Sequence, residues 1–210
     1  MLKKTVSSLM CGMYISLGAT AFIALENPVA GAFFFTAGIL MVSAFYGMLA
    51  TRVIALFPYG EYSVFDIILS LAGNTAGCVI YAALLSLTRF GNVANVAKLE
   101  RITDLRLSDS YLSLFILAVF CGFLVACACL AAKVFPDNKP VSLSLTIIFI
   151  AVFVACGFEH IVADAFFFSY YSAVKGFKAE FAPIFLVVAA GNIVGGVSTG
   201  YLERFRNGEK

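Results

Sequence analysis

The sequence predicts an all-α membrane protein with six transmembrane helices, arranged as two inverted three-helix repeats whose second and fifth helices are broken. The first observation is composition: 62% of the 210 residues are hydrophobic and only 12% are charged, whereas a soluble domain is about 25% charged. The other two observations are two overlong apolar stretches and a repeated glycine-asparagine motif. A formal net charge of +2 gives no reason to expect a nucleic-acid partner.

The apolar stretches are separated by short turns and by one longer polar segment. They cover residues 6–25, 29–56, 65–87, 111–135, 143–174 and 184–202. A single crossing needs only about 20 apolar residues, so the second and the fifth stretches are too long for one simple helix. We expect one transmembrane domain over residues 1–210, with repeat halves of about 1–87 and 111–204 joined by a solvated, mixed-charge linker, 88–110.

The repeated motif is Gly73-Asn-Thr-Ala-Gly77 in the third stretch and Gly191-Asn-Ile-Val-Gly195 in the sixth. Each copy follows an overlong stretch that carries charge, which favours a duplication of three crossings. An odd number of crossings places the two copies in opposite orientations, an arrangement typical of transport proteins. The alternative is that the glycines only allow close helix packing.

His160 is the only histidine, and it lies between Glu159 and Asp164 in the fifth stretch. An ionisable side chain at membrane depth costs about 2.5–3.5 kcal/mol even on a lenient insertion scale. We therefore expect two half-helices that meet around residues 157–164 and turn these groups toward a cavity, because irregular backbone is tolerated there only against protein or water. The alternative is an interhelical hydrogen bond made by His160.

Nothing in the sequence predicts a catalytic residue, a metal site or a cofactor. The chain has no second histidine to complete a usual zinc site, and the sequence contains no nucleophile elbow. Every cysteine lies in an apolar stretch, which suits small buried side chains: Cys11, Cys78, Cys121, Cys127, Cys129 and Cys156. We expect no enzyme; the alternatives are an intramembrane enzyme that uses Glu159, His160 and Asp164, or a scaffold without transport.

Lys and Arg residues weakly favour a cytoplasmic location of both termini. With six crossings, the side that holds the termini also holds Lys3, Lys4, Lys133, Lys139, Arg204, Arg206 and Lys210. The opposite side holds Arg89, Lys98, Arg101, Arg106, Lys175 and Lys178.

Residues 157–164, Gly-Phe-Glu-His-Ile-Val-Ala-Asp, resemble the Gly-Phe-Glu-His-x-x-Ala-Asn motif of the formate/nitrite transporter family. The two glycine-asparagine motifs are similar to those of the family's third and sixth helices. The resemblance implies a homopentamer of aquaporin-like protomers in the inner (cytoplasmic) membrane, with both termini cytoplasmic. It implies transport of small monovalent anions: formate first, or nitrite, hydrosulfide or short carboxylates.

The resemblance also implies roles for individual residues. His160 would be the central pore histidine, and Thr51 would face it from the loop of the second helix. Phe35 and Phe153 would form one constriction, and Ile39 and Leu49 would contribute to the other. Four residues depart from the family's pattern: Arg106 stands for a vestibule lysine, Arg52 for a loop glycine, Asp164 for the motif asparagine and Gly122 for a fourth-helix asparagine. The change at Gly122 removes a polar contact near the pore.

A physical mechanism follows from these side chains. Arg106 and Arg52 would concentrate anions, although Arg106 could be a solvated surface residue and Arg52 could extend to the membrane interface. His160 would hydrogen-bond the anion or lend it a proton, so protons are expected partners. We expect Glu159 to accept hydrogen bonds from backbone N–H groups of the loop, and Asp164 to influence the protonation of His160. The alternative is that Asp164 caps the N-terminus of the half-helix.

Overall fold

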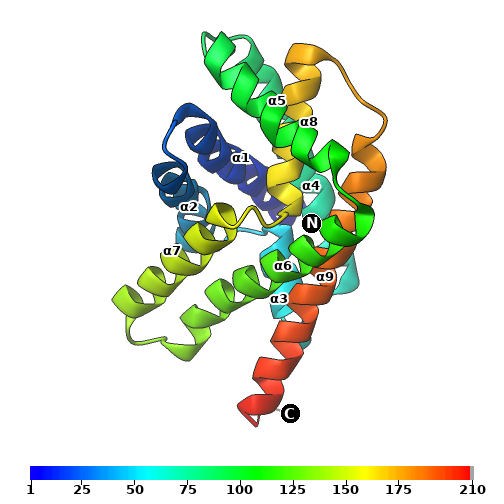
Figure 1. The fold of residues 1–210 in the computed structure, drawn as a ribbon. Coiled ribbons are helices and arrows are strands. Elements are labelled where there is room, and N and C mark those ends of the chain that lie inside the picture. Colours follow the sequence, from blue (N-terminus) through cyan, green and yellow to red (C-terminus); the bar gives the residue numbers. More distant parts are fainter. Residues whose placement is uncertain (209–210) are drawn as a thin grey trace.

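The computed structural model describes residues 1–208, and all regular structure in this range is helical (Figure 1). The elements are α1 (Leu2–Ala24), α2 (Pro28–Ala44), α3 (Ala50–Leu56), the 3-10 turn η1 (Phe57–Tyr59), α4 (Val64–Ser86), α5 (Val93–Ser108), α6 (Tyr111–Val134), α7 (Lys139–Ala155), α8 (Ile161–Lys175) and α9 (Phe181–Arg206). Helices α1, α4, α6 and α9 are long and apolar enough to cross a membrane. Lys210 lies outside the described residues.

The second and fifth apolar stretches are broken, as the sequence predicts. The first break, residues 45–49, separates α2 from α3, and the second, residues 156–160, separates α7 from α8. Both breaks end earlier than expected. Thr51 is therefore not a loop residue but lies in the first turn of α3, and Asp164 lies in the first turn of α8. The expectation of a loop at Thr51 is wrong because the N–H of Ala50 is already bonded by Asn74 Oδ1, which starts the helix there.

The two breaks begin with the same backbone turn. Each has a left-handed residue, Tyr46 with φ 50° and Gly157 with φ 68°. In each turn the next N–H reaches back five residues, the Schellman pattern that ends many helices. These hydrogen bonds are Gly47 N to Val42 O (2.8 Å) and Phe158 N to Phe153 O (3.0 Å). The two breaks therefore share one local backbone geometry, as an inverted repeat would require.

The glycines of the repeated motif lie where two helices approach closely. A Cβ on Gly77 in α4 would lie 2.1 Å from Leu9 O in α1, and a Cβ on Gly195 in α9 would lie 2.1 Å from Val119 O in α6. No side chain fits at these distances, so glycine lets the backbones touch. The glycines of the motif therefore serve close helix packing, and the motif also recurs at matching positions of the two halves.

The polar segment between the halves contains helix α5, which covers one end of the bundle (top of Figure 1). Lys98 Nζ donates to Phe22 O (2.5 Å) and Leu25 O (2.6 Å) at the end of α1. Burial, with the charge of Arg101 adding to it, lowers the pKa of Lys98. A salt bridge of 2.8 Å between Lys175 and Glu100 ties α5 to α8. This segment is therefore a packed cover rather than only a solvated linker.

Both termini lie at the other end of the bundle. Lys4, in α1, forms a 2.6 Å salt bridge with Asp66 in the first turn of α4. Arg204, near the end of α9, donates to Pro58 O in the turn before α4. The chain therefore starts and ends on the same side.

Candidate functional site

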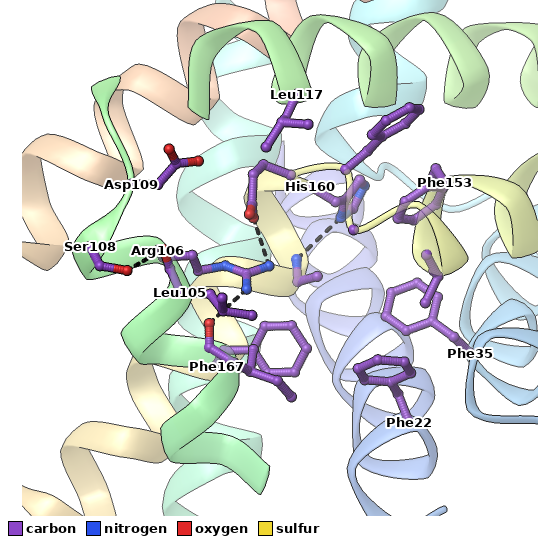
Figure 2. A pocket seen from close by; sticks show the side chains of 16 residues that line it. Phe22, Phe35, Leu105, Arg106, Ser108, Asp109, Leu117, Phe153, His160 and Phe167 are labelled. Carbon is purple, nitrogen blue, oxygen red and sulfur yellow. Dashed lines mark hydrogen bonds and ion pairs between the residues drawn. The ribbon is translucent and has the colours of Figure 1, made fainter. Parts of the chain in front are cut away.

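A cavity of about 470 Å³ lies beneath α5 and reaches His160 (Figure 2). Arg106 extends into it from α5, and Phe22, Phe35 and Phe153 line another part of its wall. The other lining residues are Ile102, Leu105, Ser108, Asp109, Leu117, Val154, Gly157, Phe158, Glu159, Ala163 and Phe167. The wall is thus mainly apolar, with a few polar groups close to the second break.

His160 occupies the N-cap of α8 and is 1% exposed. Its Nδ1 accepts a hydrogen bond of 3.1 Å from the N–H of Ala163. We assign the ring proton to Nε2 on this basis, because a nitrogen that accepts from an amide carries no hydrogen. Nε2 lies 3.1 Å from Thr51 Oγ1, so it donates to this hydroxyl. The two broken helices therefore meet at a neutral imidazole, and Thr51 faces it as the resemblance implies.

Two phenylalanines pack beside the imidazole. The ring of Phe153 stacks on His160 with centroids 5.6 Å apart, and Phe35 meets Phe153 edge-on at 5.7 Å. Both phenylalanines are 2% exposed. Ile39 and Leu49 belong to the same buried core but do not line this cavity. Apolar rings therefore lie directly beside the imidazole of His160.

Arg106 binds both acidic residues of the second break. Its Nε donates to Asp164 Oδ1 (2.9 Å), its Nη2 lies 2.6 Å from Glu159 Oε2, and its Nη1 donates to Ile102 O (2.9 Å). The side chains of Arg106, Glu159 and Asp164 are 11%, 7% and 0% exposed. Arg106 is therefore not a solvated surface residue.

This arrangement corrects two expectations about the acidic residues. The carboxylates of Glu159 and Asp164 pair with Arg106, not with loop amides or with the imidazole. The cap of α8 is supplied by His160, so Asp164 is not the capping residue either. Asp164 is one turn into α8, and its side chain points toward α5, from which Arg106 comes; no pattern in the sequence links these positions, which are 58 residues apart.

The loop backbone is held by Asn192, a residue whose role the sequence did not directly indicate. Its Nδ2 donates to Glu159 O (2.9 Å) and Ala118 O (2.8 Å), and its Oδ1 accepts from Ile161 N (3.0 Å). The recurrence of asparagine in both glycine motifs was the available signal.

Two departures from the family motif have structural explanations. Arg52 is partly buried, its Nη1 donates to Gly47 O (3.0 Å), and it does not line the cavity. It follows the break, where the backbone is already helical, so no glycine is needed there. A Cβ on Gly122 would lie 2.6 Å from Asn192 O, so this position belongs to the contact of α6 with α9. An asparagine would not fit at this position, so glycine there is a requirement of helix packing.

Two inverted halves with broken helices that meet at a buried polar group define a membrane protein of the transport class. The family model described as formate/nitrite transporter matches residues 1–202, and the chain belongs to this family. It is similar to a solved structure of an FNT family ion channel, with a TM-score of 0.86, 21% identity and coverage of 98% of this chain and 90% of that chain.

A second similar structure is a pentameric formate channel with formate bound, with a TM-score of 0.80, 19% identity and coverage of 100% of this chain and 98% of that chain. No curated protein matches the sequence. The predicted fold class is confirmed by these structural matches.

Proposed function

We propose that the chain forms a homopentameric channel that passes small monovalent anions, formate first, through each protomer. Family membership supports transport of such anions, and the similar pentameric channel holds formate. Nitrite, hydrosulfide and short carboxylates are the other candidates. The observation that carries the proposal is the Nε2–H of His160, held at the inner end of an apolar cavity with only the Thr51 hydroxyl as its partner.

The chemistry of this pair suits a partly dehydrated anion. Removing an ion from water costs several kcal/mol, and hydrogen bonds from charged or neutral donors recover part of it. The imidazole N–H and the rotatable hydroxyl of Thr51 are two donors in one place. Phe35 and Phe153 would narrow the path on the cavity side, and Ile39 and Leu49 would narrow it on the other side.

Arg106 would line the entrance without attracting anions strongly, because Glu159 and Asp164 offset its charge. Arg52 would act at a distance from the anion, because its hydrogen bond to Gly47 O supports the first break. We place Arg52 as a positioning residue of the path. The path would then run from the α5 end, past the imidazole, to the end that holds the termini.

Proton coupling through His160 stays a prediction, and the geometry sets its requirement. To lend a proton to an anion, the ring must first carry two, and the second would sit on Nδ1. That nitrogen accepts the amide N–H of Ala163, so the cap of α8 would have to break in each cycle. Passage of the anion as a hydrogen-bonded ion needs no such step.

We place the protein in the inner membrane with both termini in the cytoplasm. The chain has helices long enough to cross a bilayer, and Lys and Arg weakly favour this orientation. We further propose that it is a transporter without enzymatic activity, in agreement with its family.

Uptake into liposomes tests the function. Purified protein is reconstituted, and uptake of formate, nitrite and hydrosulfide is measured in competition at two pH values, for the wild type and for His160→Ala. We expect selective uptake by the wild type that falls at least tenfold in the variant. Equal uptake by both would remove His160 from the mechanism, and no uptake of any of the three by the wild type would contradict an anion channel. An enzyme or a scaffold predicts no such flux.

A further inference from the structure

The cluster of Arg106, Glu159 and Asp164 has one cation for two acidic side chains. Asp164 is completely buried, and the side chain of Glu159 is only 7% exposed. If both carboxyl groups were ionised, the cluster would carry one net negative charge inside the protein. Such an uncompensated buried charge is strongly unfavourable, and a buried group usually neutralises itself instead.

Hydrogen bonding leaves room for one more proton. Asp164 Oδ2 and Glu159 Oε2 are both buried and neither accepts a hydrogen bond. Glu159 Oε2 lies against the guanidinium at 2.6 Å, but as an ion pair without hydrogen-bond alignment. Buried polar atoms in native proteins nearly always have a partner, so Asp164 Oδ2, which no cation contacts, needs an explanation. A proton on one carboxyl group turns an open acceptor into a donor.

The groups around the pair do not supply the missing positive charge. In the part of the chain that the structure describes, Asp109 of the same cavity wall is itself acidic, and its carboxylate accepts from Ser110 N and Ser113 Oγ. From α6 the neighbour is the buried thiol of Cys121. From α9 the neighbour is the amide of Asn192, which donates to Glu159 O.

The break and α8 add no cation either. His160 is held as the neutral tautomer by Ala163 N–H. Phe167, on α8, packs its ring on the guanidinium at 5.3 Å, which favours the charge of Arg106 but adds none.

We infer that Glu159 and Asp164 share a single proton at neutral pH, so that the cluster with Arg106 is electrically neutral. Two carboxyl groups at one site behave in this way because they cannot both ionise cheaply, and the proton belongs to the pair rather than to either residue. Asp164 creates the pair. With an asparagine at this position, as in the motif that this segment resembles, the charges of Arg106 and Glu159 would cancel and no proton would be needed.

The consequence for transport rests on the proposed function. Glu159 and Arg106 line the cavity that leads to His160. With the shared proton, an anion enters beside a neutral cluster; without it, the anion meets a net negative charge. The acidic pair is then a proton-binding site on the anion path that is separate from His160. Whether the pair holds its proton controls the entry of the anion.

Infrared difference spectroscopy of the full-length protein in lipid tests the shared proton directly. Wild-type protein at neutral pH should show the C=O stretching band of a protonated carboxylic acid, which shifts in D₂O and is lost as the pH is raised. The band should be absent from Asp164→Asn and from Glu159→Gln, since each variant leaves one carboxylate for one guanidinium. It should be kept in the control Asp104→Asn, which removes an exposed carboxylate of α5, the helix that carries Arg106.

Absence of this band from the wild type at neutral pH overturns the inference. Its persistence in either Asp164→Asn or Glu159→Gln also overturns it, because the proton would then belong to one residue alone. This measurement needs no transport, so it stands apart from the liposome assay that tests the function.

A second arm measures formate uptake at several pH values. If uptake requires the proton on the acidic pair, uptake should fall by up to about tenfold for each pH unit above the pH at which the pair loses this proton. Relative to the Asp104→Asn control, which shares the pH effects of formate itself, Asp164→Asn should lose this decline. An unchanged decline in Asp164→Asn would separate the acidic pair from transport and overturn the proposed control of entry.

Discussion

Asn74 and Asn192 make the same three hydrogen bonds in the two halves of the protein. Asn74 donates to Ser8 O (2.7 Å) and Met48 O (3.0 Å) and accepts from Ala50 N (2.7 Å). Asn192 donates to Ala118 O and Glu159 O and accepts from Ile161 N. In each half, one amide ties a long helix, the end of a break and the start of a half-helix together. The asparagine of the repeated motif is thus the residue that holds each break in place.

Replacing either asparagine should destabilise the protein strongly. Asn192→Ala leaves Glu159 O and Ile161 N–H at the break without their partner, whereas Ala118 O keeps its bond within α6. Each buried group that loses its partner costs about 1–3 kcal/mol. We expect Asn74→Ala to behave alike, since its hydrogen bonds match. Thermal unfolding in detergent measures the loss, with the exposed Asn207→Ala as the control, expected within about 0.5 kcal/mol of the wild type. Equal melting of Asn192→Ala and this control would contradict the role of the amide.

Two substitutions of His160 separate its structural role from its role in transport. In His160→Asn the Oδ1 atom replaces Nδ1 as the cap of α8, but no donor reaches Thr51. His160→Ala loses both, and the lost cap costs about 1 kcal/mol. We expect His160→Asn to keep the thermal stability of the wild type while its formate flux falls as low as that of His160→Ala. Wild-type flux in His160→Asn would show that the Nε2–H is not needed.

Replacing Arg106 should destabilise the protein, and more so the more of its contacts to Asp164, Glu159 and Ile102 O are lost. Arg106→Lys has one ammonium group for three acceptors, Asp164, Glu159 and Ile102 O, and lysine lacks the planar donor fork. We expect a loss of about 1–3 kcal/mol, as for charge-assisted hydrogen bonds. Arg106→Ala removes the cation from buried acidic groups, a change that costs about 3–5 kcal/mol.

Urea unfolding and formate uptake measure the two effects of these Arg106 variants. Arg101→Ala, an exposed change on the same helix, is the control. If Arg106→Ala unfolded like this control, the buried cluster would not contribute to stability.

The contact of α6 with α9 should not tolerate a methyl group. A Cβ on Gly195 would lie 2.1 Å from Val119 O, so Gly195→Ala must push the two backbones apart. We expect little folded protein in the membrane fraction, measured by size-exclusion chromatography after extraction. Gly91→Ala, whose Cβ would lie 3.8 Å from Tyr170 Oη, serves as the control. Normal yield and elution of Gly195→Ala would contradict the close approach.

The sequence by itself determined the crossings, the two breaks and the duplication. Apolar length decides which segments cross, and the two overlong stretches had to break because charged residues lie within them. It also identified His160 as the central polar group, since no other histidine exists. The constriction pair of Phe35 and Phe153 came from family resemblance, and the structure places these rings in contact.

Only the tertiary structure decided which groups pair with one another. Arg106 meets Asp164 because α5 folds back over the end of α8, a contact that depends on packing and not on any local pattern. The same packing gives Asn74 and Asn192 their partners and leaves no space for a side chain at Gly122. Local sequence indicates which segments form helices, whereas the start of α3 and the direction of a buried side chain depend on the neighbour that can satisfy them.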